Sequence, residues 1–74
     1  MQIFVKTVND RTFRLEVEPY DRIYKVKGII RARENLRRGK QRLLFGGILL
    51  RSERRLIDYN IQQDYTIHLA IRQR

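Results

Sequence analysis

The chain opens with the segment MQIFVKT at residues 1–7, in which apolar side chains occupy alternate positions. The same alternation returns in FRLEV at residues 13–17. Because successive side chains of a strand point to opposite faces, both segments predict strands with one buried face. Asn9 and Asp10 lie between them and tolerate positive φ better than most residues, so the two strands are predicted to form a hairpin.

A helix is predicted to follow Pro19, which ends the second strand. Asp21 is a suitable N-cap, and Asn35 suits the left-handed position that closes the last turn. Helical spacing places on one stripe Ile23, Val26, Lys27, Ile30 and Glu34. This stripe is expected to face the sheet.

Two further segments predict the rest of the sheet. LLF at residues 43–45 and ILL at residues 48–50, separated by two glycines, are typical of a hairpin, and residues 56–59 are expected to form a short helical turn. The last strand is predicted over residues 66–72. Its alternation predicts inward Ile67, Leu69 and Ile71, and outward Thr66, His68, Ala70 and Arg72.

Four segments together resemble the ubiquitin family: MQIFVKT at residues 1–7, LEVEP at 15–19, QRL at 41–43 and DYNIQ at 58–62. The similarity runs over the whole chain without a gap, at about half of the positions, so it is far more specific than a short motif. It implies an α+β fold of the β-grasp type, a mixed sheet packed against one helix, with residues 1–74 as a single domain. A divergent natural ubiquitin-like domain and an engineered ubiquitin variant both fit the sequence.

Composition excludes several kinds of site. The chain has no cysteine, so a disulfide, a thiolate nucleophile and a thiolate metal site are excluded, and the lone His68 cannot hold a metal by itself. No nucleophile or orienting acid is evident beside His68, so neither catalysis nor a cofactor is expected. No apolar run reaches the length of a membrane span, and no signal-peptide layout opens the chain. We therefore expect a cytoplasmic or nuclear protein without membrane binding.

The resemblance implies a protein-binding patch of outward apolar side chains and His68. Its residues here are Val8, Leu44, His68 and Ala70, and its neighbours are Arg42, Gly47 and Arg72. Ile48 and Leu49, in an expected solvent turn, would extend the patch. The implied partners are ubiquitin-recognising proteins such as receptors, ligases or deubiquitinases. Self-association through the same patch is a further expectation.

A covalent modifier is the alternative that the resemblance raises. Polymers of the family are linked through lysines, but three acceptor positions here hold Arg11, Ile48 and Gln63. Lys6 and Lys27 do match acceptor lysines. The acidic partner that the family places beside Lys27 is replaced by Ser52.

The end of the chain also departs from the family. A conjugated modifier needs a tail that ends in two glycines, whereas this sequence ends in Gln73 and Arg74. As written, the chain is not expected to be activated or conjugated. A modifier whose terminal glycines are missing from this sequence remains the alternative.

The charge balance raises a third function. Lysine and arginine number 17 against 8 acidic residues, which gives a formal charge of +9. Such a balance attracts polyanions without a specific site. Candidate residues for nucleic-acid or other polyanion binding form two clusters, one of Arg31, Arg33, Arg37, Arg38 and Lys40 and one of Arg51, Arg54 and Arg55, with Tyr20, Tyr24 and Tyr65 available for stacking. Binding of this kind is expected to be weak and salt-sensitive.

Overall fold

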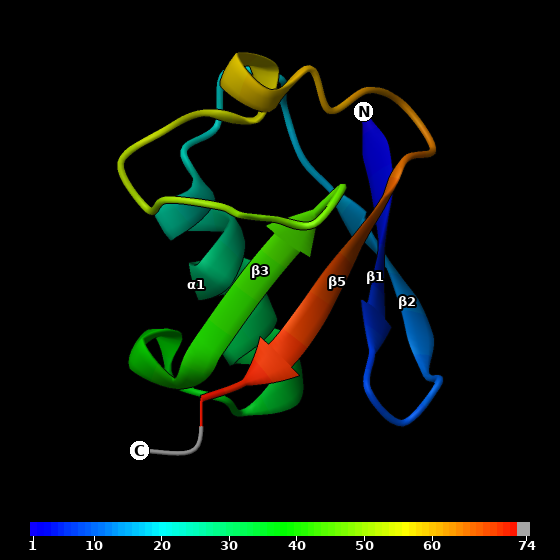
Figure 1. The fold of residues 1–74 in the computed structure, drawn as a ribbon, viewed down its shortest axis with the longest axis vertical. Helices are drawn as coiled ribbons and strands as arrows, with labels where there is room; N and C mark the ends of the chain where they lie inside the picture. Colours follow the sequence, from blue (N-terminus) through cyan, green and yellow to red (C-terminus); the bar gives the residue numbers. More distant parts are fainter. Residues whose placement is uncertain (73–74) are drawn as a thin grey trace.

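The computed structural model describes residues 1–72 and confirms the predicted α+β architecture of the β-grasp type (Figure 1). Five strands form one mixed sheet in the order β2-β1-β5-β3-β4, in which β1 and β5 are parallel and the other pairs antiparallel. A single long helix packs across one face of this sheet. The elements are β1 (Gln2–Thr7), β2 (Thr12–Glu16), α1 (Ile23–Glu34), η1 (Arg38–Lys40), β3 (Gln41–Phe45), β4 (Ile48–Leu49), η2 (Leu56–Tyr59) and β5 (Thr66–Ile71).

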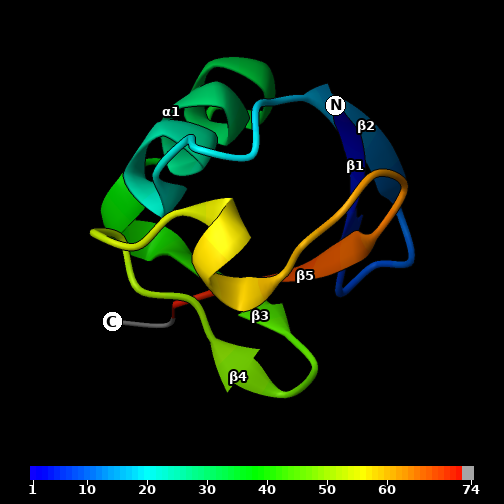
Figure 2. The ribbon, with the colours of Figure 1, turned by 90° about the horizontal axis from the view of Figure 1, so that it is seen from above.

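The core lies between α1 and the covered face of the sheet. The helix contributes Ile23, Val26 and Ile30, all fully buried, and every strand except β4 contributes inward side chains. Fully buried aliphatic side chains each stabilise the fold by about 1.5–3 kcal/mol. The opposite face of the sheet is not covered by α1 (Figures 1 and 2).

The turns follow the sequence chemistry. Asp10 and Asn35 adopt the left-handed backbone predicted for them, with φ of 63° and 54°. The β3–β4 turn uses Gly46 at φ 58° and Gly47 at φ 80°, a pair of positive angles that suits a tight hairpin. Both predicted hairpins are confirmed.

Asp21 does not cap the helix, which corrects one prediction. The residue at the N-cap is Arg22, which has no capping hydrogen bond through its side chain. The Asp21 carboxylate instead accepts a hydrogen bond from the Glu18 backbone N–H at 2.9 Å and lies 3.3 Å from Lys25 Nζ. The helix therefore begins one residue later than an Asp21 cap would require, because the turn after β2 uses this carboxylate.

Ile71 is not part of the core, which corrects a second prediction. Its place in the alternation is inward, and it lies opposite the buried Gln41. Nevertheless, 49% of its surface is exposed. Ile71 borders a cavity at the C-terminal end of α1, so alternation alone overestimates its burial.

A side-chain latch attaches the η1 segment to the helix. Arg38 Nε donates to the carbonyl of Tyr24 at 3.0 Å, and its guanidinium lies 4.0 Å from the centre of the Tyr24 ring. The guanidinium runs over Gly28, where a Cβ atom would overlap it. Gln41 Nε2 donates to two further carbonyls, those of Lys27 and Leu36.

Within residues 1–72, no helix has the length and apolar character to cross a membrane.

Candidate functional site

The uncovered face of the sheet brings most of the predicted binding residues together. β3 and β5 pair so that Leu44 lies opposite His68, and β3 and β4 pair so that Leu49 lies opposite Leu44. Paired residues share a face of the sheet, and the intervening residues of β3 and β5 are buried against α1. Leu49, Leu44 and His68 therefore form one row, with Ala70 two residues further along β5. We call these four residues the apolar face.

Ile48 does not extend the apolar face, which corrects another expectation. It is exposed, but it pairs with Phe45 and not with Leu44. Because neighbouring residues of a strand point to opposite faces, Ile48 lies on the other side of the hairpin from Leu49. Phe45 there stacks on Tyr65, with ring centres 5.7 Å apart.

Val8 lies at the tip of the β1–β2 turn and is 71% exposed. It borders a cavity of about 160 Å³ between this turn, the end of α1 and the end of β5. Leu36 and Ile71 also line this cavity, and the sequence prediction assigned neither of them to the binding surface. The sequence did contain one signal for this surface, because Ile71 is an apolar residue at the end of the last strand.

A basic rim flanks the apolar face. Arg42 is exposed and lies opposite Ala70, on the same face of the sheet. The backbone N–H of Arg72 donates to the Lys40 carbonyl at 2.7 Å, which fixes the end of β5 beside η1. Gly47 lies in the exposed β3–β4 turn beside the face. Gln73 and Arg74, the residues of the predicted tail, lie outside the described residues.

The two candidate acceptor lysines differ in accessibility. Lys6 is exposed, and its ammonium lies 3.5 Å from Asp10. Lys27 is half-buried and donates to the Ser52 hydroxyl at 3.0 Å; among the described residues no carboxylate lies within ion-pair distance of its ammonium. Burial lowers the pKa of Lys27 below its ordinary value. The neutral Ser52 hydroxyl thus contacts Lys27 at the position where the family has an acid.

Members of the two predicted polyanion-binding clusters lie at opposite ends of α1. Arg31, Arg33 and Arg37 lie at the C-terminal end of α1, whereas Arg54 lies at its N-terminal end, where its carbonyl accepts from the Ile23 backbone N–H. A helix of 12 residues separates the two ends, a length of about 18 Å. Tyr65 is occupied by its stack on Phe45.

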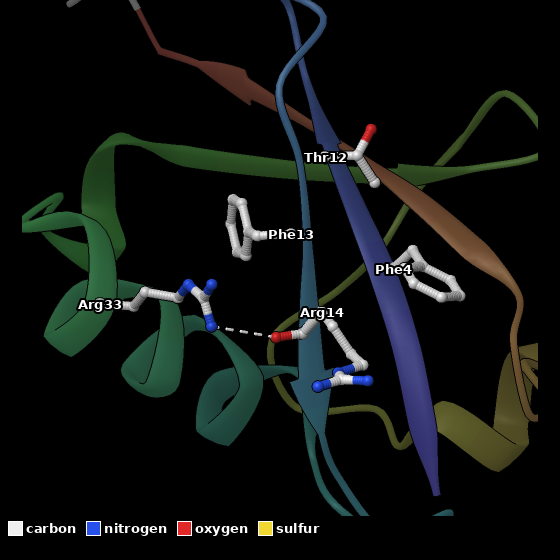
Figure 3. A pocket seen from close by; sticks show the side chains of 5 residues that line it. All are labelled: Phe4, Thr12, Phe13, Arg14 and Arg33. Atoms are coloured by element: carbon white, nitrogen blue, oxygen red, sulfur yellow. Dashed lines mark hydrogen bonds between the residues drawn. The ribbon is translucent and has the colours of Figure 1, made fainter.

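Arg33 also has a structural role along the edge strand β2 (Figure 3). Its Nη1 donates to the Arg14 carbonyl at 3.1 Å, and its guanidinium lies 5.0 Å from the centre of the Phe13 ring. These contacts cover part of the strand edge, which would otherwise present unpaired backbone groups. A cavity of about 370 Å³ lies here, lined by Phe4, Thr12, Phe13, Arg14 and Arg33.

This lining gives no support for catalysis, because none of its side chains is a carboxylate or an imidazole that could activate Thr12. In the described part of the chain, no group of three or more His, Cys, Asp or Glu side chains is placed to hold a metal ion.

Comparison with known proteins supports the fold. The model of the ubiquitin family matches residues 3–74. The chain belongs to the ubiquitin family. This ubiquitin-like domain is 28% identical over 71 residues to Ubiquitin-like protein NEDD8 of Dictyostelium discoideum, an alignment that covers 96% of the domain and 92% of the relative.

Longer relatives also match the ubiquitin-like domain. Ubiquitin-like protein 4A of Rattus norvegicus is 33% identical over 72 residues, which cover 97% of the domain but 46% of the relative. AN1-type zinc finger protein 4 of Mus musculus is 31% identical over 74 residues, which cover the whole domain but 10% of the relative. The domain therefore matches both proteins of its own length and parts of longer chains.

Proposed function

We propose that this ubiquitin-like domain is a protein-binding module that presents the apolar face to ubiquitin-recognising proteins. The observation that carries the proposal is the strand register, which aligns Leu49, Leu44 and His68 on the sheet face that α1 does not cover. Leu49 is exposed, Leu44 and Ala70 are partly exposed, and apolar side chains that gather on one accessible face are typical of binding sites. The guanidinium groups of Arg42 and Arg72 at the rim favour acidic side chains on the partner.

Leu44→Ala tests the proposal directly. Leu44 is central in the row, so its truncation should weaken binding to a ubiquitin-binding receptor domain or a deubiquitinase by about 1–3 kcal/mol. Calorimetry measures the loss, and circular dichroism checks that the variant is folded. Equal affinity of Leu44→Ala and the parent chain for every such partner would place the binding surface elsewhere.

A matched pair of variants separates the two sides of the β3–β4 hairpin. Leu49→Lys places a charge on the apolar face, whereas Ile48→Lys places the same charge on the Phe45 side. Leu49→Lys should weaken both partner binding and any concentration-dependent self-association in sedimentation, and Ile48→Lys should change both much less. The reverse order would show that Ile48 belongs to the contact surface.

The function of a covalent modifier is the second candidate. It is favoured by the match to Ubiquitin-like protein NEDD8 over 92% of that relative's length. Synthesis of the chain with two added glycines would test it, with formation of a thioester on a ubiquitin-type activating enzyme as the readout. Absence of the thioester would exclude this candidate.

A further inference from the structure

Two segments far apart in the sequence form a continuous seam at the N-terminal end of α1. Backbone N–H groups of Ile23 and Tyr24 donate to the carbonyls of Arg54 and Ser52, at 2.8 and 2.9 Å. In return, the N–H groups of residues 56 and 57 donate to the carbonyls of residues 21 and 19, and residues 22 and 55 form an isolated bridge. Figure 2 shows the chain before α1 running beside η2. These bonds fix the segments 19–24 and 52–57 side by side.

Two tyrosines project from this seam. Tyr20 is 69% exposed and follows Pro19, whose carbonyl binds the N–H of the exposed Ile57. Tyr24 is 56% exposed and lies at the other end, beside Ser52. One side of the Tyr24 ring is covered by Arg38, and the exposed remainder is open to a ligand. Exposed aromatic rings on a rigid backbone are suitable platforms for stacking.

The same two segments carry three exposed arginines, Arg22, Arg54 and Arg55. Arg22 donates to a backbone carbonyl, that of Glu53, and none of the three forms an ion pair among the described residues. We call these three arginines with Tyr20 and Tyr24 the tyrosine–arginine seam. A surface of this composition suits a ligand with both phosphate groups and flat rings.

The carboxylates near the seam are largely engaged by the domain itself. Asp21 binds a backbone N–H and Lys25, and Asp58 accepts from the Arg55 backbone N–H at 2.8 Å. Glu53 lies 3.0 Å from Arg51, and a backbone hydrogen bond lowers its pKa, with Arg51 and Arg54 adding to the effect. Lys25 and Arg51 thus offset the charges of Asp21 and Glu53, whereas Asp58 and the exposed Glu18 keep their negative charge beside the seam.

We infer that the tyrosine–arginine seam binds single-stranded nucleic acid, with bases stacked on Tyr20 and Tyr24 and phosphates paired with its arginines. Both rings are exposed, and aromatic stacking accepts any base. The seam carries no hydrogen-bonding arrangement for a particular base. The interaction is therefore independent of sequence.

Fluorescence anisotropy with a labelled oligothymidine of about ten nucleotides tests the inference. The double variant Tyr20→Leu, Tyr24→Leu keeps apolar bulk but removes the aromatic rings, and it should weaken binding about tenfold or more. The double variant Arg54→Gln, Arg55→Gln should also weaken binding. The slope of log affinity against log salt concentration should become less steep by about 0.7 for each phosphate that is no longer neutralised. Leu44→Ala should bind the oligonucleotide like the parent chain.

The matched control is Arg31→Gln with Arg37→Gln, which removes the same charge at the other end of α1. Its affinity should fall clearly less than that of the Arg54, Arg55 variant. Equal losses in both, or tyrosine variants that bind as the parent does, would reduce the interaction to net-charge attraction and overturn the inference. Tighter, tyrosine-dependent binding of polyglutamate than of the oligonucleotide would also overturn it. Thermal unfolding of each variant provides the check on folding.

Discussion

On the apolar face, Leu44 and His68 are neighbours because β3 and β5 pair at one register. On the tyrosine–arginine seam, Tyr24 and Ser52 are neighbours because the start of α1 and the segment before η2 are joined by backbone hydrogen bonds. The first surface is a regular sheet whose outward side chains follow from period-2 alternation. The second has no period, so alternation does not predict which of its residues meet. The comparison shows that one small fold can support two surfaces of different chemistry, because each is held by a different part of the hydrogen-bond network.

Different buried residues lie beneath the apolar face and beneath the tyrosine–arginine seam. Leu43 and Leu69 lie under the apolar face and pair directly with one another across the strands. Leu56 and Ile23 lie under the seam, and the backbone of each takes part in it. We therefore expect the seam to depend more than the sheet on a single buried side chain.

Leu56→Ala should have the largest effect. Leu56 is fully buried, and its N–H donates to the Asp21 carbonyl in the seam. Its truncation leaves a cavity and should lower the free energy of unfolding by about 2–5 kcal/mol. Urea denaturation measures the loss. Hydrogen exchange should show the N–H groups of Ile23 and Ile57 losing more protection than the bonded N–H groups of β3 and β5.

A uniform loss of protection over the seam and the sheet would contradict this expectation. The two surfaces would then unfold as one cooperative unit, and the distinction between them would be one of chemistry alone.

Ser52→Asp should have the next largest effect, because it places a carboxylate beside the half-buried ammonium of Lys27 at the point where the helix meets the seam. We expect a gain of about 1 kcal/mol at neutral pH, between the values typical of exposed ion pairs and of hydrogen bonds to charged groups. The gain should disappear in a Lys27→Met background. A gain that persists there would come from the neighbouring arginines.

Lys27 and Ser52→Asp also predict how the stability of the fold changes with pH. Burial lowers the pKa of Lys27 in the folded protein below its ordinary value of 10.5. Between these two pKa values the unfolded chain binds more protons than the folded one, so this group makes stability rise as pH increases toward 10.5. Ser52→Asp favours the charged ammonium and should reduce that rise. Denaturation from pH 7 upward, with Lys27→Met subtracted, isolates the contribution.

Gly28→Ala should have the smallest effect and an unusual sign. In an exposed helix position, alanine would stabilise by about 1 kcal/mol relative to glycine. Here the added Cβ would displace the Arg38 guanidinium from Tyr24, so we expect a neutral or slightly destabilising change. In an Arg38→Ala background the same substitution should stabilise by about 1 kcal/mol. Identical changes in both backgrounds, measured by thermal unfolding, would show that the latch contributes nothing.

Much of the fold could be predicted from the sequence because its signals are local. Alternation identified the strands, turn chemistry placed Asp10 and Asn35 in left-handed positions, and helical spacing selected the buried stripe of α1. The outward residues of the apolar face followed from the same alternation. Once the buried residues of β3 and β5 are known, Leu44 and His68 must point to the opposite face of the sheet. The resemblance to the ubiquitin family is confirmed by the match over residues 3–74.

What the sequence did not determine depends on where elements end and which segments meet. Ile71 has the correct parity but borders a cavity at the end of α1, and Ile48 has the correct exposure but the wrong side of the hairpin. Asp21 has the right chemistry for a cap but is used by the preceding turn. The contacts of Arg38 with Tyr24 and of Lys27 with Ser52 join positions 14 and 25 residues apart. Local preferences act over a few residues, so only the packing of α1 against the sheet and the seam decided these contacts.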